Sequence, residues 1–290
     1  MSILPIVDTA GMPGARERAI AHVASLAAGG PADPSWRVTL HFHPDRLTGR
    51  MPILERMAAD GVYRSQFETG TSNGGLTAHP GGDRWRWENR IFAGAYDGEP
   101  AAARPRYGSL NFRGRRAGGS PRFGSAYFRL SESALARTTF CYPDSVFGPR
   151  HFGVASKMSA LVALAASDDR DPLDDYIEAQ VHGVVSLDRD VEALVLDPCY
   201  RGTPTEAAAR QLPCPVEWHG GFTLTAAELR RHPEYRGPQF VALGLFLARD
   251  GRLDPRIIGD AARTGRYGEQ ALKRVWHYLA RFGHPGMRTA

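Results

Sequence analysis

The stretch YIEAQVHG at residues 176–183 predicts a β-strand with one polar and one apolar face. Its polar residues Glu178, Gln180 and His182 share a face, because successive side chains of a strand point to opposite sides. Such a face is typical either of a solvated sheet surface or of a functional site. The strand lies in the middle of the chain between apolar segments, which favours a site. A carboxylate held there is suited to fixing a hydroxyl or stabilising a developing positive charge.

A second predicted strand carries two histidines. Residues 37–43 (RVTLHFH) are rich in β-branched residues and alternate, so that His41 and His43 share one face. The strand is expected to end at Pro44. Two imidazoles on one face are typical either of an ordinary strand end or of a site for a metal or polar ligand.

A third segment, GGSPRFGSAYF at residues 118–128, joins a glycine-rich stretch to a predicted strand. Glycines let a backbone approach a ligand closely and leave N–H groups free for anions. Tyr127, at the start of the strand, is suited to stacking on a flat ligand. The alternative is a glycine-rich hairpin followed by a core aromatic residue.

The whole pattern predicts an α+β protein whose sheet lies between about residues 37 and 197. We expect an N-terminal helical segment (1–36), a core (37–202) and a mainly helical C-terminal region packed on it (203–290). Further strands are expected at 62–67, 106–112, 125–130, 137–142 and 191–196, with an extended Trp85–Glu88 in a loop-rich stretch. Helices are expected at 13–28, 51–59, 157–166, 205–212, 225–232, 239–248 and 269–282.

Composition narrows the class of protein. Of the 290 residues, 42% are hydrophobic and 23% charged, which is ordinary for a soluble globular protein. The sequence has no apolar run of about 18 residues and therefore predicts no membrane span. The first residues lack the basic and apolar regions of a secretory signal, and the three cysteines form no CxxC pair. We therefore expect a cytoplasmic protein without a membrane partner.

Arginine dominates the basic residues. The chain has 36 Lys and Arg against 31 Asp and Glu, and only Lys157 and Lys273 are lysines. Codon usage in GC-rich DNA explains such a bias, whereas the functional explanation is anion binding, because guanidinium groups pair bidentately with phosphate. Several arginines precede Tyr127 and interleave with aromatic residues, namely Arg104, Arg106, Arg113, Arg115, Arg116 and Arg122.

Taken in order, the three segments resemble the ADP-ribosyltransferase superfamily, in the branch of diphtheria-type toxins and poly-ADP-ribose polymerases. There a strand-borne histidine precedes a helix that ends in glycine, as His43 precedes residues 53–61 here. A Phe-Gly pair leads into a Tyr-Phe strand, as in residues 123–128, and a late strand carries a glutamate, as Glu178 does here. The resemblance covers residues 37–197. The chain also resembles a bacterial family of unassigned function, through the segments PRFGSAYF (121–128) and EAQVHG (178–183). Pro44 departs from the ADP-ribosyltransferase pattern, because that family often has glycine after the histidine.

The resemblance implies a split β-sheet core with flanking helices and a toxin-like, NAD-dependent ADP-ribosyltransferase activity. Such an enzyme cleaves the nicotinamide glycosidic bond of NAD, its substrate, and transfers ADP-ribose to a protein or nucleic-acid acceptor, with no metal expected. Glu178 would stabilise the oxocarbenium-like charge, with Gln180 positioning the acceptor and Tyr127 stacking on nicotinamide. The implied NAD-binding residues are His43, His41, Arg46, Gly124, Ser125 and Tyr127.

Two other functions remain open from the residues. The segment His-x-His-Pro-Asp is also typical of a metal-dependent hydrolase, with His151, His182 and His219 available as further ligands. The arginines that precede Tyr127, together with Tyr107 and Phe112, suit a basic nucleic-acid-binding module that pairs with phosphates and stacks on bases.

Overall fold

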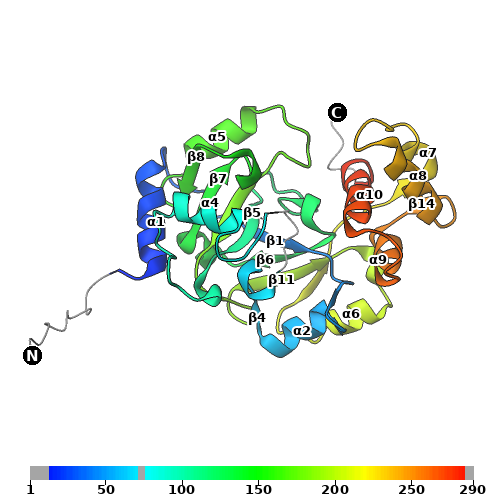
Figure 1. Cartoon of the computed structure of the whole chain (residues 1–290), viewed down its shortest axis with the longest axis horizontal. Coiled ribbons are helices and arrows are strands. Elements are labelled where there is room, and N and C mark those ends of the chain that lie inside the picture. The colour runs from blue at the N-terminus through cyan, green and yellow to red at the C-terminus, as the bar shows by residue number, and fades with distance from the viewer. Residues whose placement is uncertain (1–12, 71–75, 285–290) are drawn as a thin grey trace, which may run out of the picture.

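The computed structural model describes residues 13–70 and 76–284, and confirms the predicted α+β class (Figure 1). One mixed sheet of eight strands has the order β12-β11-β6-β1-β5-β9-β7-β8. All neighbours are antiparallel except β11 and β12, which are parallel. The strands are β1 (Val38–Phe42), β5 (Arg106–Leu110), β6 (Ala126–Leu130), β7 (Thr138–Tyr142), β8 (His151–Val154), β9 (Ile177–Val181), β11 (Val191–Leu196) and β12 (Val216–Trp218).

Ten α-helices surround this sheet in the described residues. They are α1 (Ala15–Leu26), α2 (Ile53–Asp60), α3 (Gln66–Thr69), α4 (Asp83–Ile91), α5 (Ser159–Ser167), α6 (Pro204–Ala209), α7 (Ala226–Leu229), α8 (Pro238–Leu247), α9 (Pro255–Arg263) and α10 (Glu269–Phe282). In Figure 1, α7 to α10 lie together at one end of the molecule and α1 at the other. No helix in the described part of the chain is long and apolar enough to cross a membrane.

Short elements complete the fold. Three small two-stranded sheets pair β10 with β4, β13 with β14, and β2 with β3. These strands are β2 (Leu47–Thr48), β3 (Met51–Pro52), β4 (Val62–Tyr63), β10 (Val185–Ser186), β13 (Leu224–Thr225) and β14 (Arg252–Leu253). The 3-10 helices are η1 (Ala101–Ala103), η2 (Pro121–Phe123), η3 (Glu132–Arg137), η4 (Ser145–Phe147) and η5 (Pro198–Tyr200).

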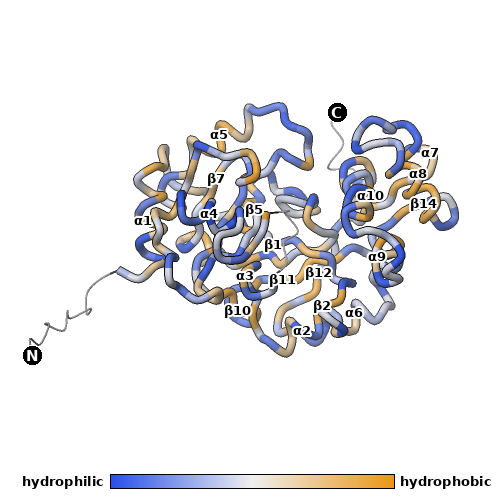
Figure 2. The backbone as a smooth tube through the Cα atoms, in the orientation of Figure 1, coloured by the Kyte–Doolittle hydropathy of each residue, from blue (hydrophilic) through white to orange (hydrophobic). Residues whose placement is uncertain are grey.

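The main core lies on one face of the sheet. Leu40 and Phe42 of β1 point into it, with Phe128 of β6 beside them, and α2 contributes the fully buried Leu54. A second apolar cluster joins the C-terminal helices and includes Trp276 of α10. Figure 2 shows apolar residues along the central strands and in α8, and hydrophilic residues in the outer loops.

The predicted strands at 37–43, 125–130, 137–142 and 191–196 are confirmed, and so are the helices at 13–28, 51–59, 157–166 and 269–282. Three predictions are wrong. The Trp85–Glu88 segment lies in α4, because residues 84, 87, 88 and 91 are buried at helical spacing. The predicted strand at 62–67 stops after Tyr63, since Ser65 caps α3 with a capping box. The sheet also extends beyond residue 197, to β12.

Candidate functional site

The second face of the sheet is polar and yet buried. The strand register places Thr39 of β1 beside Ser109 of β5, and Ser109 beside Glu178 of β9. Their side chains point away from the apolar core, because their neighbours along each strand point into it. All three residues are buried. Polar groups enclosed in this way need specific partners, and these partners define the candidate site.

The sheet brings His41 and Tyr127 together, as adjacent residues of β1 and β6. Their ring centroids are 5.0 Å apart. The backbone N–H of Ser120 donates to His41 Nε2 at 3.3 Å, so the ring proton lies on Nδ1, which donates to the carbonyl of Gly124 at 3.1 Å. Burial lowers the pKa of His41 to about 3, so this histidine is neutral at physiological pH.

The glycine-rich segment at 118–124 therefore lies directly over His41. A Cβ at Gly118 would overlap the His41 ring, and one at Gly124 would overlap the backbone of Phe42. The hydroxyl of Tyr127 donates to the carbonyl of Arg116 at 2.9 Å. The glycines thus serve close packing of this segment against β1, and both ring nitrogens of His41 are occupied by the protein itself.

Glu178 lies on the same face, on β9, two strands from β1 across β5. The register places it level with Thr39, two residues along β1 from His41. The Ser145 hydroxyl donates to Glu178 Oε2 at 2.8 Å, and the side-chain amide of Gln180 donates to Oε1 at 3.0 Å. Arg84 Nη1 lies 3.6 Å from Oε1 and donates to Ser145 at 2.8 Å. The Ser145 backbone N–H and the Cys141 thiol also donate to Glu178, at 3.3 and 3.9 Å, so one cation and four hydrogen-bond donors hold this carboxyl group.

Burial and the neighbouring Asp144 raise the pKa of Glu178, whereas Arg84 and the Ser145 hydroxyl lower it. The Asp144 carboxylate accepts a hydrogen bond from the buried Tyr176 hydroxyl. A carboxyl group with a raised pKa in a closed setting is a common feature of functional sites.

Helix α4 supplies the groups that the sequence patterns did not reveal. Arg84 stacks over the ring of Tyr107, with its Cζ 3.9 Å from the centroid. One turn later, Glu88 accepts from the Tyr107 hydroxyl at 2.6 Å and pairs with Arg104 at 2.6 Å. The signal was the spacing of Arg84, Trp87, Glu88 and Ile91, which is that of a helix face with buried charges.

Removing the Arg84 cation tests how far Glu178 depends on it. Arg84→Gln is expected to lower the free energy of unfolding by about 3 kcal/mol, because it leaves a buried carboxylate without its counterion. Arg86→Gln is the matched control on the same helix, since the Arg86 side chain is 64% exposed, and we expect a change within about 0.5 kcal/mol. Urea denaturation measures both. Equal stabilities of the two variants would show that Arg84 does not support the network.

The other predicted residues lie in different settings. Gln180 is fully buried and accepts from the Thr139 hydroxyl at 2.9 Å. His43 packs edge-on against Trp276 of α10, with centroids 5.0 Å apart, and burial lowers its pKa to about 3. Arg46 is half-buried in the turn after β1. The Ser125 hydroxyl is 3.4 Å from the Tyr200 hydroxyl.

The arginines before Tyr127 mostly have protein partners. Arg104 is buried against Glu88, and Arg106 is buried with Glu68 at 3.2 Å and several backbone carbonyls. Arg113 and Arg115 share Asp175, and Arg122 pairs with Asp174. These five side chains connect the segment to the rest of the fold.

No group of three or more His, Cys, Asp and Glu residues within 13–70 and 76–284 is arranged to hold a metal ion. His182 Nδ1 is 2.6 Å from the Tyr96 hydroxyl, and His219 Nε2 is 2.8 Å from the carbonyl of Ser125. The exposed His151 lies at the start of β8. The described residues therefore offer no set of metal ligands for the metal-dependent hydrolase alternative.

Comparison with protein-family models places the chain in a known family. A family model described as "Protein of unknown function (DUF3626)" matches residues 37–169 and 164–282. The search of curated proteins found no match.

Proposed function

Because the chain belongs to the DUF3626 family, whose description assigns no function, we propose an activity from the site itself. The chain is an ADP-ribosyltransferase that cleaves NAD at the nicotinamide glycosidic bond and transfers ADP-ribose to a protein or nucleic-acid acceptor. Glu178 is the catalytic carboxylate of this proposal. His41, His43, Arg46, Gly124, Ser125 and Tyr127 belong to the NAD-binding side, and Gln180 positions neighbouring groups.

The observation that carries the proposal is the joint placement of Glu178 and the His41–Tyr127 pair on one buried polar face. A division of the sheet supports it. β1 and β5 pair only through Val38 and Thr39, whereas β5 pairs with β9 along its whole length. The eight-stranded sheet is continuous, but its junction between β1 and β5 is short, with His41 on one side and Glu178 on the other, which supports a split-sheet arrangement.

The chemistry needs a negative charge at the reacting sugar. Departure of nicotinamide leaves positive charge on the ribose, which a preorganised carboxylate in a water-poor setting stabilises. Burial and the neighbouring Asp144 raise the pKa of Glu178 to about 8, against Arg84 and the Ser145 hydroxyl, so the ionised form that the reaction needs is the minor one at neutral pH and becomes the major one above about pH 8. The same burial keeps water away from a reactive intermediate.

The covering segment sets a condition for this activity. Ser120 and Gly124 occupy both nitrogens of His41, so NAD reaches His41 only when residues 118–124 move away from β1. Trp276 of α10 donates to the carbonyls of Pro121 and Arg122 at 3.0 and 3.1 Å. In this proposal, movement of the segment is therefore linked to the C-terminal helices.

The test is incubation of the purified chain with NAD labelled in its adenosine half, with and without a cell lysate. We expect nicotinamide release, with label appearing in protein or nucleic acid. Release without label transfer would identify water as the acceptor. Absence of nicotinamide release under both conditions would overturn the proposed activity.

A further inference from the structure

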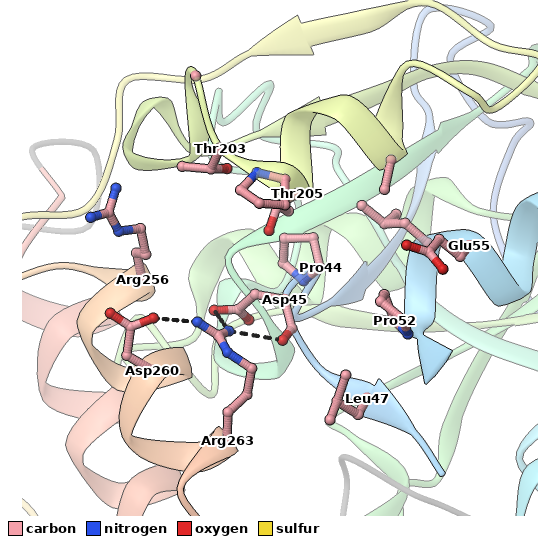
Figure 3. A pocket seen from close by; sticks show the side chains of 14 residues that line it. Pro44, Asp45, Leu47, Pro52, Glu55, Thr203, Thr205, Arg256, Asp260 and Arg263 are labelled. Carbon is pink, nitrogen blue, oxygen red and sulfur yellow. Dashed lines mark hydrogen bonds and ion pairs between the residues drawn. The ribbon is translucent and has the colours of Figure 1, made fainter. Parts of the chain in front are cut away.

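A pocket of about 480 Å³ opens beside the C-terminal end of β1 (Figure 3). Its walls come from the turn after β1, from α2, from the start of α6 and from α9. The volume lies within the roughly 300–1,000 Å³ that is usual for small-molecule sites. None of the residues proposed for NAD or for catalysis lines it. The pocket is therefore a second candidate site, with its own lining residues.

Asp45 forms a buried part of the pocket wall. Its side chain is 2% exposed, and neither carboxylate oxygen meets a donor of the described residues at good hydrogen-bond geometry, although the Tyr200 hydroxyl is near enough to lower the pKa of Asp45. The nearest cation is Arg263, whose Nη1 lies 3.5 Å from Oδ2. Burial raises the pKa of Asp45 to about 6, against the opposing charges of Arg263 and Arg46. A buried carboxylate without a well-formed hydrogen bond is costly and is typical of a ligand-binding site.

Helix α9 is shaped around this carboxylate. A Cβ at Gly259 would overlap Asp45 Oδ2, so only glycine fits where the helix passes Asp45. The helix begins at the Asp254 cap, whose side chain accepts from the N–H of Ile257 at 2.8 Å. The fold therefore makes room for the Asp45 carboxylate although its burial costs stability. Such a cost is typical of a residue that binds a ligand.

The same helix offers a cation. Arg256 lines the pocket, is exposed, and forms no ion pair with the residues that the structure describes. Arg263 is different, because it pairs with Asp260 and also donates to the Asp45 carbonyl at 3.1 Å. Figure 3 shows the Arg256 guanidinium above Asp260, away from the Arg263–Asp45 contact. Arg256 is thus the guanidinium open to an anion.

These features select a ligand with hydrogen-bond donors and an anionic group. A carboxylate accepts from hydroxyls, and a guanidinium pairs with phosphate in a fork. Pro44, Pro52 and Pro204 supply flat apolar surface between them. We propose that this pocket binds a phosphorylated sugar, free or as part of a nucleotide, with its hydroxyls on Asp45 and its phosphate on Arg256.

The pocket is distinct from the site of the proposed transferase. Its α2 and α6 walls belong to elements packed on the apolar face of the sheet, through Leu54 and Ala208. Glu178 and His41 lie on the opposite face. A ligand in the pocket does not contact Glu178, so Glu178→Gln should retain binding, and failure of the transferase assay leaves this inference testable.

Calorimetric titration of the full chain with ribose 5-phosphate, AMP and adenosine tests the site. We expect both phosphates to bind and adenosine to bind at least about tenfold more weakly. Tighter binding of AMP than of ribose 5-phosphate would identify a nucleotide, and equal binding a free sugar phosphate. Arg256→Gln should weaken phosphate binding at least about tenfold. Arg252→Gln, an exposed arginine outside the pocket, is the control.

Asp45→Asn gives a second readout that separates a ligand group from a structural one. The pKa of Asp45 is raised on folding, so its charge destabilises the fold above about pH 6, and this penalty fades as the pH falls toward 4. Asp45→Asn should therefore raise Tm at pH 8, change it little at pH 4, and weaken ribose 5-phosphate binding. A lower Tm at pH 8 with unchanged binding would overturn the proposal, as would the absence of any phosphate binding to the parent chain at about 1 mM.

Discussion

Glu178→Gln is expected to reduce nicotinamide release from NAD by at least about 100-fold. The substitution keeps the size of the side chain and its place beside Ser145 and Gln180, but removes the negative charge that stabilises the positive charge on the ribose as nicotinamide leaves. Folding should persist, because burial raises the pKa of Glu178 and a neutral amide is less costly there. Single-turnover measurement of nicotinamide release, together with the Tm of the variant, checks both expectations.

Glu217→Gln is the matched control for this experiment. Glu217 also lies on a strand of the main sheet, β12, but its side chain is 47% exposed and pairs with Arg129. Its loss should leave turnover unchanged, since exposed ion pairs contribute little. Full activity of Glu178→Gln, or equal losses in the two variants, would remove Glu178 from the proposed mechanism.

Gly124→Ala is expected to lower the free energy of unfolding by at least about 4 kcal/mol, or to prevent accumulation of folded protein. The added Cβ would overlap the carbonyl group of Phe42, which belongs to the central strand and cannot move independently. The change also disturbs the Gly124 carbonyl that accepts from His41. Thermal and urea denaturation followed by circular dichroism measures the loss.

Gly268→Ala separates this close approach from a general effect of replacing glycine. Gly268 has φ −62°, and a Cβ there meets no atom within 4 Å. We expect its stability to stay within about 1 kcal/mol of the parent protein. If Gly124→Ala were as mild as Gly268→Ala, the glycine-rich segment would not be held against β1 as described.

The sequence predicted the polar strand β9 and the two strands that meet at His41 and Tyr127, because alternation of residue types reports directly on strand faces. It did not predict which half of the sheet each strand joins. Val38 and Leu110 become partners although 72 positions separate them. Such pairings depend on packing of the whole chain and leave no local signal.

The sequence also did not reveal Arg84, Glu88 and Asp45 as buried groups. A prediction from hydrophobic periodicity assigns charged residues to the surface. The buried arginine and glutamate of α4 interrupt its apolar pattern, so the segment is not recognised as a helix. Asp45 follows the histidine strand in a turn, where aspartate is ordinary. Its burial comes from α9, and Gly259 reveals this only once the helix is in place.

The arginine bias has a partly structural explanation. Arg104 and Arg106 are buried and bind carboxylates and carbonyls inside the fold. Lysine lacks the planar fork that lets one side chain meet several acceptors at once. Arg106 uses this fork on the carbonyls of Tyr63, Ala102 and Gly183. At these positions, therefore, arginine is required by geometry and not only permitted by codon usage.

The strand order has a consequence for biosynthesis. β1 is the first strand of the main sheet to leave the ribosome, yet its partners β5 and β6 begin at Arg106 and Ala126. Both edges of its sequence VTLHF remain unpaired while the intervening residues are made, and an open apolar edge is a template for association with other chains. Chains cut short before residue 130 should therefore bind chaperones, and chains long enough for β6 to leave the ribosome should be released from them.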